Sequence, residues 1–305
     1  MRFNVVGVGE VLWDLLPSGV QLGGAPANFA YHTHSLGATS LVVSRIGDDV
    51  RGQEILQRFG EMKLSTEGLQ IDRKAPTGTA SVAVEGGGLP HFAIEENVAW
   101  DYIAVTSRGL AAAREAHAIC FGTLAQRSEL GRKTVRTLVN ATPKNALRVF
   151  DINLRQHYHS PELIAESLRL SNILKLNEEE LSTLAEMFGV AGSTNRSTKE
   201  QIRQLATMFD QKIIALTRGA SGSLLYRGGE WSDYRSAPIK VVDTVGAGDS
   251  FTAALVMGVL SKMDLNRTNA IANDVASYVC LHAGATPSMP GEFSERFQTG
   301  DSHEK

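Results

Sequence analysis

The sequence has few of the features that mark secreted, membrane or nucleic-acid-binding proteins. Its 305 residues include only two cysteines, Cys120 and Cys280, both in apolar runs, so we expect buried thiols and no disulfide framework. No apolar run approaches the roughly twenty residues of a transmembrane helix, and no signal peptide precedes the first strand-like run. A formal net charge of −3 gives no electrostatic reason to expect nucleic acid or a membrane surface as partner. These absences favour a globular protein of the cytoplasm.

Two common nucleotide-binding fingerprints are also missing. No Gly-x-x-x-x-Gly-Lys-Ser/Thr run occurs, which excludes P-loop chemistry at the level of the motif. Residues 7–12, Gly-Val-Gly-Glu-Val-Leu, begin like a dinucleotide fingerprint but lack its third glycine and the following helix. We therefore interpret them as the end of a strand.

Short apolar runs alternate with amphipathic runs along most of the chain, which is 43% hydrophobic and 21% charged. This alternation predicts an α/β fold with a parallel sheet and helices on both of its faces. In such sheets ligands bind at the carboxyl ends of the strands. The expected strands are residues 4–8, 40–44, 118–122, 147–152, 173–176 and 212–217. The expected helices are residues 27–36, 52–62, 131–140, 161–168, 178–188 and 199–209.

Two segments break the alternation. Residues 15–22 and 79–95 read as consecutive extended segments without helices, and three glycines at 86–88 suggest a hairpin turn. We expect a small β-sheet, built from about 15–24 and 76–97, to lie over the mouth of the site. The alternative is an edge hairpin of the main sheet. The whole chain, 1–305, is expected to form one domain with a frayed tail after about residue 292.

The most informative run is Asp-Thr-Val-Gly-Ala-Gly-Asp-Ser at 243–250. Its glycines can adopt positive φ, so backbone N–H groups can converge on one anion. Apolar residues then recur at helical spacing, which predicts a helix starting near Gly248 with its positive dipole end at the same anion. Asp249 could accept a proton from a substrate hydroxyl. The run indicates phosphoryl transfer to an alcohol; the alternative is a turn with an aspartate cap.

A second run, Gly-Gly-Ala-Pro-Ala-Asn-Phe-Ala at 23–30, sets two glycines against the start of a helix. Together with 243–250 it resembles the signatures of the PfkB (ribokinase-like) family of sugar kinases, and the likeness extends from about Phe3 to Pro290. Residues 121–124 and 150–155 most resemble the fructokinase branch.

The resemblance implies a ribokinase-like three-layer sandwich with a mainly parallel central sheet and a small β-sheet lid. It also implies transfer of the γ-phosphoryl group of ATP, with Mg²⁺, to a primary hydroxyl. Asp249 would be the base, and the N–H groups of Gly246, Ala247 and Gly248 would stabilise the phosphoryl group. Fructose giving fructose 6-phosphate is the preferred reaction.

The resemblance also implies residues for the acceptor sugar. Asp14 and Asn28 would hold sugar hydroxyls, while Gly23 and Gly24 would line the pocket. An asparagine suits this role because its amide both donates and accepts hydrogen bonds. Asp14 is expected just after the first strand; the alternatives are a turn residue for Asp14 and a helix cap for Asn28. Arg155 could neutralise a phosphoryl group or a substrate carboxylate, or form a structural salt bridge.

For the phosphate donor, the resemblance implies that Asn177 and Glu180 organise Mg²⁺ and phosphates through water. This sparse set suffices because Mg²⁺ usually keeps several of its waters. The alternative is an acidic first helical turn. The turn containing Thr217, Gly219 and Gly222 would bind the nucleotide.

Two further features belong to this side of the implied site. Asn273, on an expected helix at 270–281 closed by Gly284 and Ala285, would flank the adenine. Backbone carbonyls of Asp243 and Val245 could hold a monovalent cation such as K⁺.

Three alternatives stay open at this point. The acceptor could be 2-keto-3-deoxygluconate or ribose, and the chain could instead be a non-catalytic sugar-binding regulator on the same fold. The partners we expect are a small sugar and ATP, with no nucleic acid or membrane, in a monomer or a homodimer.

Overall fold

In the computed structural model, which describes residues 2–16, 19–83, 91–190 and 197–297, nine strands form one large sheet. Their order is β13-β12-β11-β10-β9-β8-β1-β4-β5. All neighbours are parallel except β11–β12 and β12–β13. The strands are β1 (Asn4–Val8), β4 (Thr39–Gly47), β5 (Leu69–Asp72), β8 (Ala118–Phe121), β9 (Leu147–Asp151), β10 (Ile173–Asn177), β11 (Ile213–Thr217), β12 (Ser223–Arg227) and β13 (Glu230–Tyr234).

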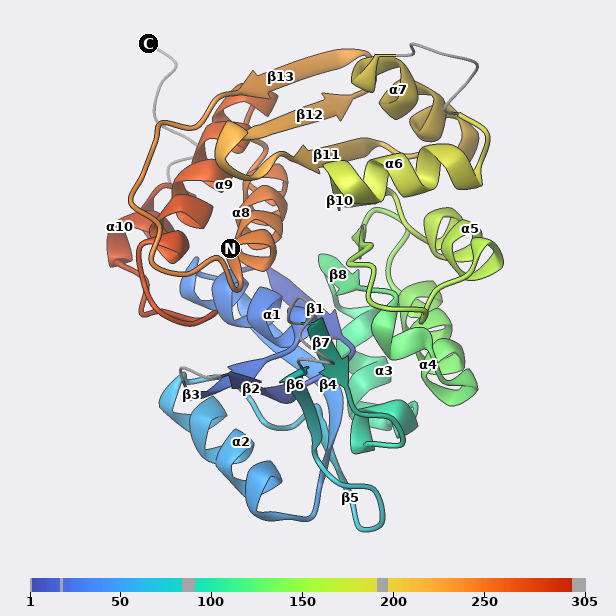
Figure 1. Cartoon of the computed structure of the whole chain (residues 1–305), viewed down its shortest axis with the longest axis vertical. Coiled ribbons are helices and arrows are strands. Elements are labelled where there is room, and N and C mark those ends of the chain that lie inside the picture. Colours follow the sequence, from blue (N-terminus) through green and yellow to red (C-terminus); the bar gives the residue numbers. More distant parts are fainter. Residues whose placement is uncertain (1, 17–18, 84–90, 191–196, 298–305) are drawn as a thin grey trace.

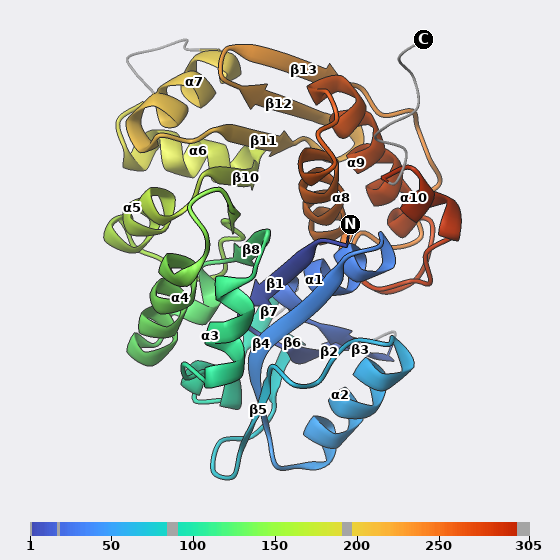
Figure 2. The same cartoon turned by 180° about the vertical axis from the view of Figure 1, so that it is seen from behind.

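Helices cover both faces of this sheet, as the two opposite views make clear (Figures 1 and 2). One face carries α3 (Ser107–Arg114), α4 (Glu129–Ala141), α5 (Pro161–Leu170), α6 (Glu178–Met187) and α7 (Thr198–Phe209). The other carries α1 (Ala25–Ser35), α8 (Ala247–Leu260), α9 (Leu265–Cys280) and α10 (Gly291–Glu295). The expected three-layer α/β arrangement is therefore confirmed.

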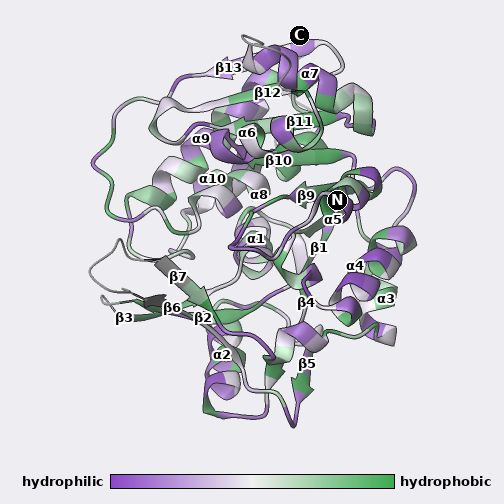
Figure 3. Cartoon of the chain, turned by 45° about the vertical axis from the view of Figure 1, so that its right-hand side comes forward, coloured by the Kyte–Doolittle hydropathy of each residue, from purple (hydrophilic) through white to green (hydrophobic). Residues whose placement is uncertain are grey.

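The two helical layers rest on alternate side chains of the same strands, because successive strand residues point to opposite faces. In β1, Val6 and Val8 pack into the core that holds Leu138 of α4. Val5 packs instead into the core that holds Leu255 of α8. Strands buried on both sides need continuous apolar runs. Figure 3 accordingly shows β10 in the hydrophobic colour and α4 in both colours.

A separate four-stranded sheet has the order β3-β2-β6-β7. Trp13 and Leu22 anchor it in a third apolar core with Phe59 of α2 and Tyr31 of α1. The extended segments expected at 15–22 and 79–95 thus form a small sheet rather than an edge of the main sheet; the glycine turn at 86–88 lies outside the described residues. The elements are β2 (Leu12–Leu16), β3 (Gly19–Gly23), β6 (Gly78–Ala83), β7 (His91–Ile94) and α2 (Val50–Glu61).

Some boundaries differ from the sequence-based expectation. The helix expected at 270–281 begins at Leu265, where the Asp264 side chain accepts from the Arg267 N–H, and ends at Cys280. Gly284 and Ala285 therefore do not close it; they lie in the following loop. Residues 7–12 do form a strand end, because β1 stops at Val8 and β2 follows without a helix between them. None of the helices in the described segments has the length and hydropathy that a membrane span requires.

Candidate active site

Two adjoining cavities open at the carboxyl ends of the parallel strands. The first, of about 420 Å³, lies under the small sheet, and the second, of about 520 Å³, lies between the β11–β12 turn and α9. Four residues line both cavities: Asn177, Thr217, Thr244 and Gly248. The expected residues Asp14, Gly24, Asn28, Arg155, Glu180, Val245, Gly246 and Asp249 line the first, and Ala247, Gly219, Gly222 and Asn273 line the second. We call the first the acceptor cavity and the second the donor cavity, after the roles that the resemblance implies for the residues that line them; Gly248 lies at their junction.

The glycine run forms the start of α8, as expected. Gly246 is its N-cap with φ 77°, and no side chain caps the helix. A Cβ at Gly246 would lie 2.5 Å from the carbonyl oxygen of Ala285, so only glycine fits between the loop and the helix. The N–H of Ala247 donates to Thr244 O (3.3 Å), so this donor is engaged within the loop. The helix start still presents its positive end to the junction of the two cavities.

Asp249, in the first turn of α8, is held from another element. The Nδ2 of Asn28, on α1, donates to its Oδ2 over 2.8 Å. Burial, and next the charge of Asp151, raise the pKa of Asp249 to about 6, although Asn28, Lys175 and Arg155 act in the other direction. A carboxylate with a pKa near 6 is ionised at neutral pH yet basic enough to take a proton.

Lys175 is a buried cation that the sequence analysis missed. Its Nζ lies 3.0 Å from Asp151 Oδ1, and Asp151 Oδ2 accepts from the Thr252 hydroxyl at 2.9 Å. Burial lowers the pKa of Lys175, but the carboxylates of Asp151, Glu180 and Asp249 outweigh it and raise the pKa overall. A Cβ at Gly248 would lie 3.0 Å from Nζ, so the ammonium sits directly beneath the glycine run.

Glu180 and Asn177 form a reciprocal cap at the start of α6. The Glu180 N–H donates to Asn177 Oδ1 (2.9 Å), and the Asn177 N–H donates to Glu180 Oε2 (2.8 Å). The Leu154 N–H donates to Oε1 at 3.0 Å. Burial raises the pKa of Glu180, while Lys175 opposes the rise. Glu180 therefore combines the capping role with a place on the cavity wall.

This donor set suits Mg²⁺ held through water and phosphate oxygens rather than by a cage of side chains. In the described segments, no three His, Cys, Asp or Glu side chains converge on a position for a metal. Each Glu180 oxygen keeps a second lone pair after accepting a backbone N–H. Mg²⁺ commonly binds through one or two carboxylates and its own waters, so Glu180 and Asn177 fit.

Asp14 lies in the middle of β2, not in the loop after the first strand as expected. The chain turns straight from β1 into the small sheet, which brings Asp14 over the acceptor cavity. Burial raises its pKa to about 6, and Arg155 opposes the rise. Gly23 lies behind the Asp14 carboxylate, where a side chain would collide with it, so it makes room for Asp14 rather than lining the cavity. Gly24 does line the cavity.

Arg155 follows β9 and reaches the acceptor cavity from an exposed loop. Asn153 and Gln156, on either side of it, have φ values of 44° and 45°. Such left-handed geometry is rare outside glycine and often accompanies functional loops. The alternative role of Arg155 is a structural salt bridge. In the same run it is Asp151 that forms a buried salt bridge, with Lys175.

The donor cavity is lined mainly by the β11–β12 turn and α9. Gly219 and Gly222 adopt positive φ there, as a tight turn requires. The Asn273 amide donates to the Ser223 hydroxyl (2.7 Å) and to Asn269 O (2.8 Å), so it is engaged within the protein although the residue lines the cavity. Cys280 also lines the cavity and is only partly buried, unlike the buried thiol expected.

The loop behind the glycine run is fixed from two sides. Asp243 accepts from the Val245 N–H with Oδ1 and from the Gly284 N–H with Oδ2, both at 3.0 Å. The fully buried His32 ring places Nε2 2.9 Å from Ala285 O. Burial lowers the pKa of His32 to about 4, so its neutral ring donates this bond. The expected monovalent-cation role of Asp243 and Val245 concerns their carbonyls and stays a prediction.

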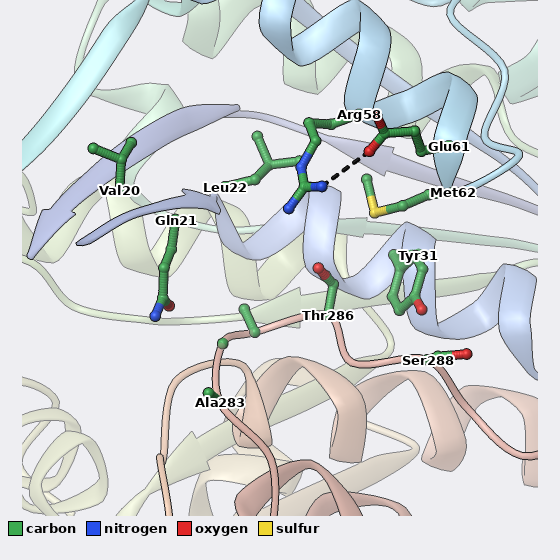
Figure 4. Close-up of a pocket in the computed structure, with 12 residues that line it drawn as sticks. Val20, Gln21, Leu22, Tyr31, Arg58, Glu61, Met62, Ala283, Thr286 and Ser288 are labelled. Carbon is green, nitrogen blue, oxygen red and sulfur yellow. Dashed lines mark hydrogen bonds and ion pairs between the residues drawn. The ribbon is translucent and has the colours of Figure 1, made fainter. Parts of the chain in front are cut away.

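A third cavity, of about 400 Å³, lies on the outer side of this loop, between β3, α2 and residues 283–288 (Figure 4). Arg58 and Glu61 pair at its edge, and the Gln21 amide extends from β3 towards Ala283. A Cβ at Gly284 would lie 3.6 Å from Gln21 Oε1. The small sheet therefore reaches the same loop that supports the glycine run.

The sequence is similar to those of known carbohydrate kinases. The pattern described as pfkB family carbohydrate kinase matches residues 19–292. A protein of Pyrococcus horikoshii described as an uncharacterized sugar kinase is 29% identical over 300 residues, covering 92% of this chain and 91% of the relative. A fructokinase of Klebsiella pneumoniae is 27% identical over 282 residues, 88% of each chain.

Solved structures share the fold. The uncharacterized sugar kinase of P. horikoshii, in complex with ATP, superposes with a TM-score of 0.78 at 26% identity, covering 96% of this chain and 99% of the other. A fructokinase from Vibrio cholerae, in a form with fructose, ADP and calcium bound, gives a TM-score of 0.78 at 21% identity over 95% and 96% of the two chains. That second likeness concerns the ribokinase-like fold alone. Since the family pattern spans most of the sequence, the protein belongs to the pfkB family of carbohydrate kinases.

Proposed function

We propose that the protein transfers the γ-phosphoryl group of ATP to a primary hydroxyl of a neutral sugar, with fructose as the preferred acceptor. The observation that carries the proposal is the position of Asp249, which accepts a hydrogen bond from Asn28 and lines the acceptor cavity one residue after Gly248, where that cavity adjoins the donor cavity. The acceptor hydroxyl enters beneath the small sheet, and the triphosphate enters from the β11–β12 turn.

In the proposed reaction, the acceptor oxygen forms a bond to the γ-phosphorus as the bond to the β–γ bridging oxygen of ATP breaks. The hydroxyl proton passes to Asp249. The first-turn N–H groups of α8 and the Lys175 ammonium face the negative charge on the phosphoryl oxygens, the arrangement that stabilises phosphoryl transfer most. Bound Mg²⁺ would neutralise phosphate charge, with Glu180 and Asn177 holding it through water.

The small sheet is proposed to act as the lid. Asp14 on β2 would bind sugar hydroxyls, and Leu12, Leu16, Ala80 and Ile94 supply the apolar roof of the cavity. Excluding water favours transfer to the sugar over hydrolysis of ATP. Gln21 of the small sheet and Gly284, in the loop behind the glycine run, line the same outer cavity.

The charges of the acceptor cavity favour a neutral sugar over a sugar acid. Four carboxyl groups, those of Glu10, Asp14, Glu180 and Asp249, line it. Lys175 is paired with Asp151 and faces the phosphoryl group in the proposed reaction, which leaves the exposed Arg155 as the cation available to a substrate carboxylate among the described lining residues. A substrate carboxylate would have to enter against these carboxyl groups, so 2-keto-3-deoxygluconate is the weaker candidate. The choice of fructose over ribose rests on the fructokinase relatives.

The test is ADP release from Mg-ATP with fructose, ribose, 2-keto-3-deoxygluconate, glucose and a nucleoside. We expect the highest kcat/KM with fructose. A higher value with another sugar would replace the substrate and keep the Asp249 mechanism. Sugar binding by calorimetry without ADP release from any acceptor would instead support the non-catalytic regulator.

A further inference from the structure

Glu10 is a buried carboxyl group of the acceptor cavity to which the reaction described above gives no role. It follows β1 and is 3% exposed. The backbone N–H groups of Glu10 itself and of Ala25 act on the carboxyl and lower its pKa. Its Oε2 atom nevertheless has no hydrogen-bond partner. A buried polar atom without a partner costs free energy, so it points to a partner that the protein itself does not supply.

The surroundings of Glu10 favour its uncharged form over the carboxylate more than in an ordinary glutamate. Asp249 on α8 adds negative charge, and Arg155 is the cation that acts on it. Asp14 on β2, Lys175 on β10 and Glu180 on α6 also line the cavity, and the Lys175 ammonium is bound to Asp151. Burial, opposed by the backbone N–H groups and then aided by Asp249, raises the pKa of Glu10 to about 7.

We propose that Glu10 is a specificity-determining residue that binds the acceptor sugar as a neutral carboxylic acid, donating from Oε2 to a substrate oxygen. This inference rests on the proposed function, because it assumes that the acceptor occupies this cavity. The neutral acid differs from the neighbouring carboxylates, which only accept hydrogen bonds from hydroxyl groups. A donor on Glu10 and acceptors on Asp14 and Asp249, all lining the same cavity, match a polyol, whose oxygens need both kinds of partner.

The hydrogen-bond donor on Glu10 would determine which acceptor sugars bind. A substrate that presents a carbonyl, a ring oxygen or a hydroxyl oxygen to Oε2 gains a hydrogen bond. A deoxy sugar with no oxygen at that position leaves the buried acid unpaired and loses affinity, the strongest form of discrimination that a polar site provides. Glu10 therefore selects acceptor sugars that carry an oxygen opposite Oε2, whereas Asp249 accepts the proton of the reacting hydroxyl.

The test compares Glu10→Gln with Glu10→Leu. Glutamine keeps a donor that does not titrate, while leucine keeps the approximate size without any polar atom. We expect Glu10→Leu to raise the KM for fructose about 10-fold, the effect of one lost hydrogen bond, and to leave the KM for ATP unchanged. We expect Glu10→Gln to stay within about threefold of the original enzyme. Glu54→Leu, at an exposed position of α2, is the matched control.

A pH series supplies a readout that a merely structural role would not change. The donor is lost as Glu10 ionises, so the original enzyme's KM for the acceptor should rise at least about fivefold between pH 6.5 and 8.5. In Glu10→Gln it should stay flat. Infrared difference spectra of the free enzyme should carry a protonated-carboxyl band that Glu10→Gln removes.

Three outcomes would overturn the inference: an unchanged acceptor KM in Glu10→Leu, an equal loss in Glu10→Gln and Glu10→Leu, or no protonated-carboxyl band at Glu10. Failure of the proposed function looks different. In that case the original enzyme releases no ADP with any sugar of the panel, while the infrared band of Glu10 is still present.

Discussion

Asn28 and Asp249 are joined by a hydrogen bond of 2.8 Å although 221 residues separate them in the chain. The bond links α1 to the first turn of α8, and these two helices pack side by side on one face of the large sheet. It also brings together one residue from each of the two sequence signatures. The hydrogen bond therefore adds a direct side-chain link between the two signatures to the packing of α1 against α8.

This contact is one of the influences on the pKa of Asp249, after burial and the charge of Asp151. Asn28 donates to the carboxylate and so lowers its pKa, against the rise to about 6 caused by burial. The base works in its ionised form, so kcat should fall as the pH drops through about 6. In Asn28→Ala the pKa of Asp249 should rise, and the acid limb of the kcat profile should move to higher pH. The measurement is kcat against pH at saturating sugar and ATP. If the acid limb of the kcat profile lay at the same pH in both enzymes, Asn28 would have no effect on the pKa of the catalytic base.

Lys175 is expected to contribute both stability and rate. Lys175→Met leaves Asp151 as an uncompensated buried charge, which should cost about 3–5 kcal/mol of unfolding free energy. It should also lower kcat at least about 10²-fold, because the ammonium no longer faces the phosphoryl oxygens. Chemical denaturation and steady-state kinetics measure the two effects.

The double variant Lys175→Met with Asp151→Asn distinguishes the two contributions. It removes the unpaired charge, so most of the stability should return while kcat stays low. If kcat returned together with the stability, the role of Lys175 would be structural only.

Gly246 should not tolerate a side chain. In Gly246→Ala the new Cβ meets Ala285 at the back of the glycine run, so the start of α8 must shift. We expect kcat/KM for ATP to fall at least about tenfold as the N–H donors lose their alignment. Gly228→Ala is the matched control, because Gly228 also has positive φ, 54°, but no atom lies within 4 Å of its Cβ position. Equal kcat/KM for ATP in Gly246→Ala and Gly228→Ala would contradict the claim that the N–H donors at the start of α8 depend on Gly246.

His32 should make stability depend on pH. Its folded pKa of about 4 lies below its ordinary value of 6.5, so the unfolded chain binds the additional proton. The contribution is therefore fully present above about pH 6.5 and is lost as the pH falls towards 4. The two values correspond to about 3 kcal/mol, at about 1.4 kcal/mol per pKa unit. Denaturant unfolding at pH 7.5 and 4.5 should show this loss in the original protein and not in His32→Gln. The same loss in both proteins would rule out His32 as its source.

Local patterns predicted the layers of the fold and the main features of the site. The run at 243–250 was interpretable because glycines, a helix start and a carboxylate follow one another directly in the chain. The strand at 173–176 was similarly clear from its apolar residues, and β10 extends one residue beyond it. Asp14 was misplaced because the turn from β1 into a separate sheet leaves only a weak local signal.

The buried Lys175–Asp151 pair could not be predicted in the same way. It requires that β9 and β10 be neighbours and that Asp151 stand directly opposite Lys175 in the parallel register. A lysine inside the apolar run of β10 was the available signal, because a charge there needs a buried partner. Glu10 gave a similar signal, an acidic residue between the apolar residues of β1 and β2, but its unpartnered oxygen is visible only in three dimensions.

The central claim is that Asp249 takes the proton of the acceptor hydroxyl, and ADP release by Asp249→Asn with Mg-ATP and fructose tests it most directly. The variant keeps the size of the side chain, and Asp48→Asn, at an exposed position, is its control. We expect kcat to fall at least about 10²-fold in Asp249→Asn, with an unchanged melting profile and no change in Asp48→Asn. Turnover close to that of the original enzyme in a folded Asp249→Asn protein would contradict the account.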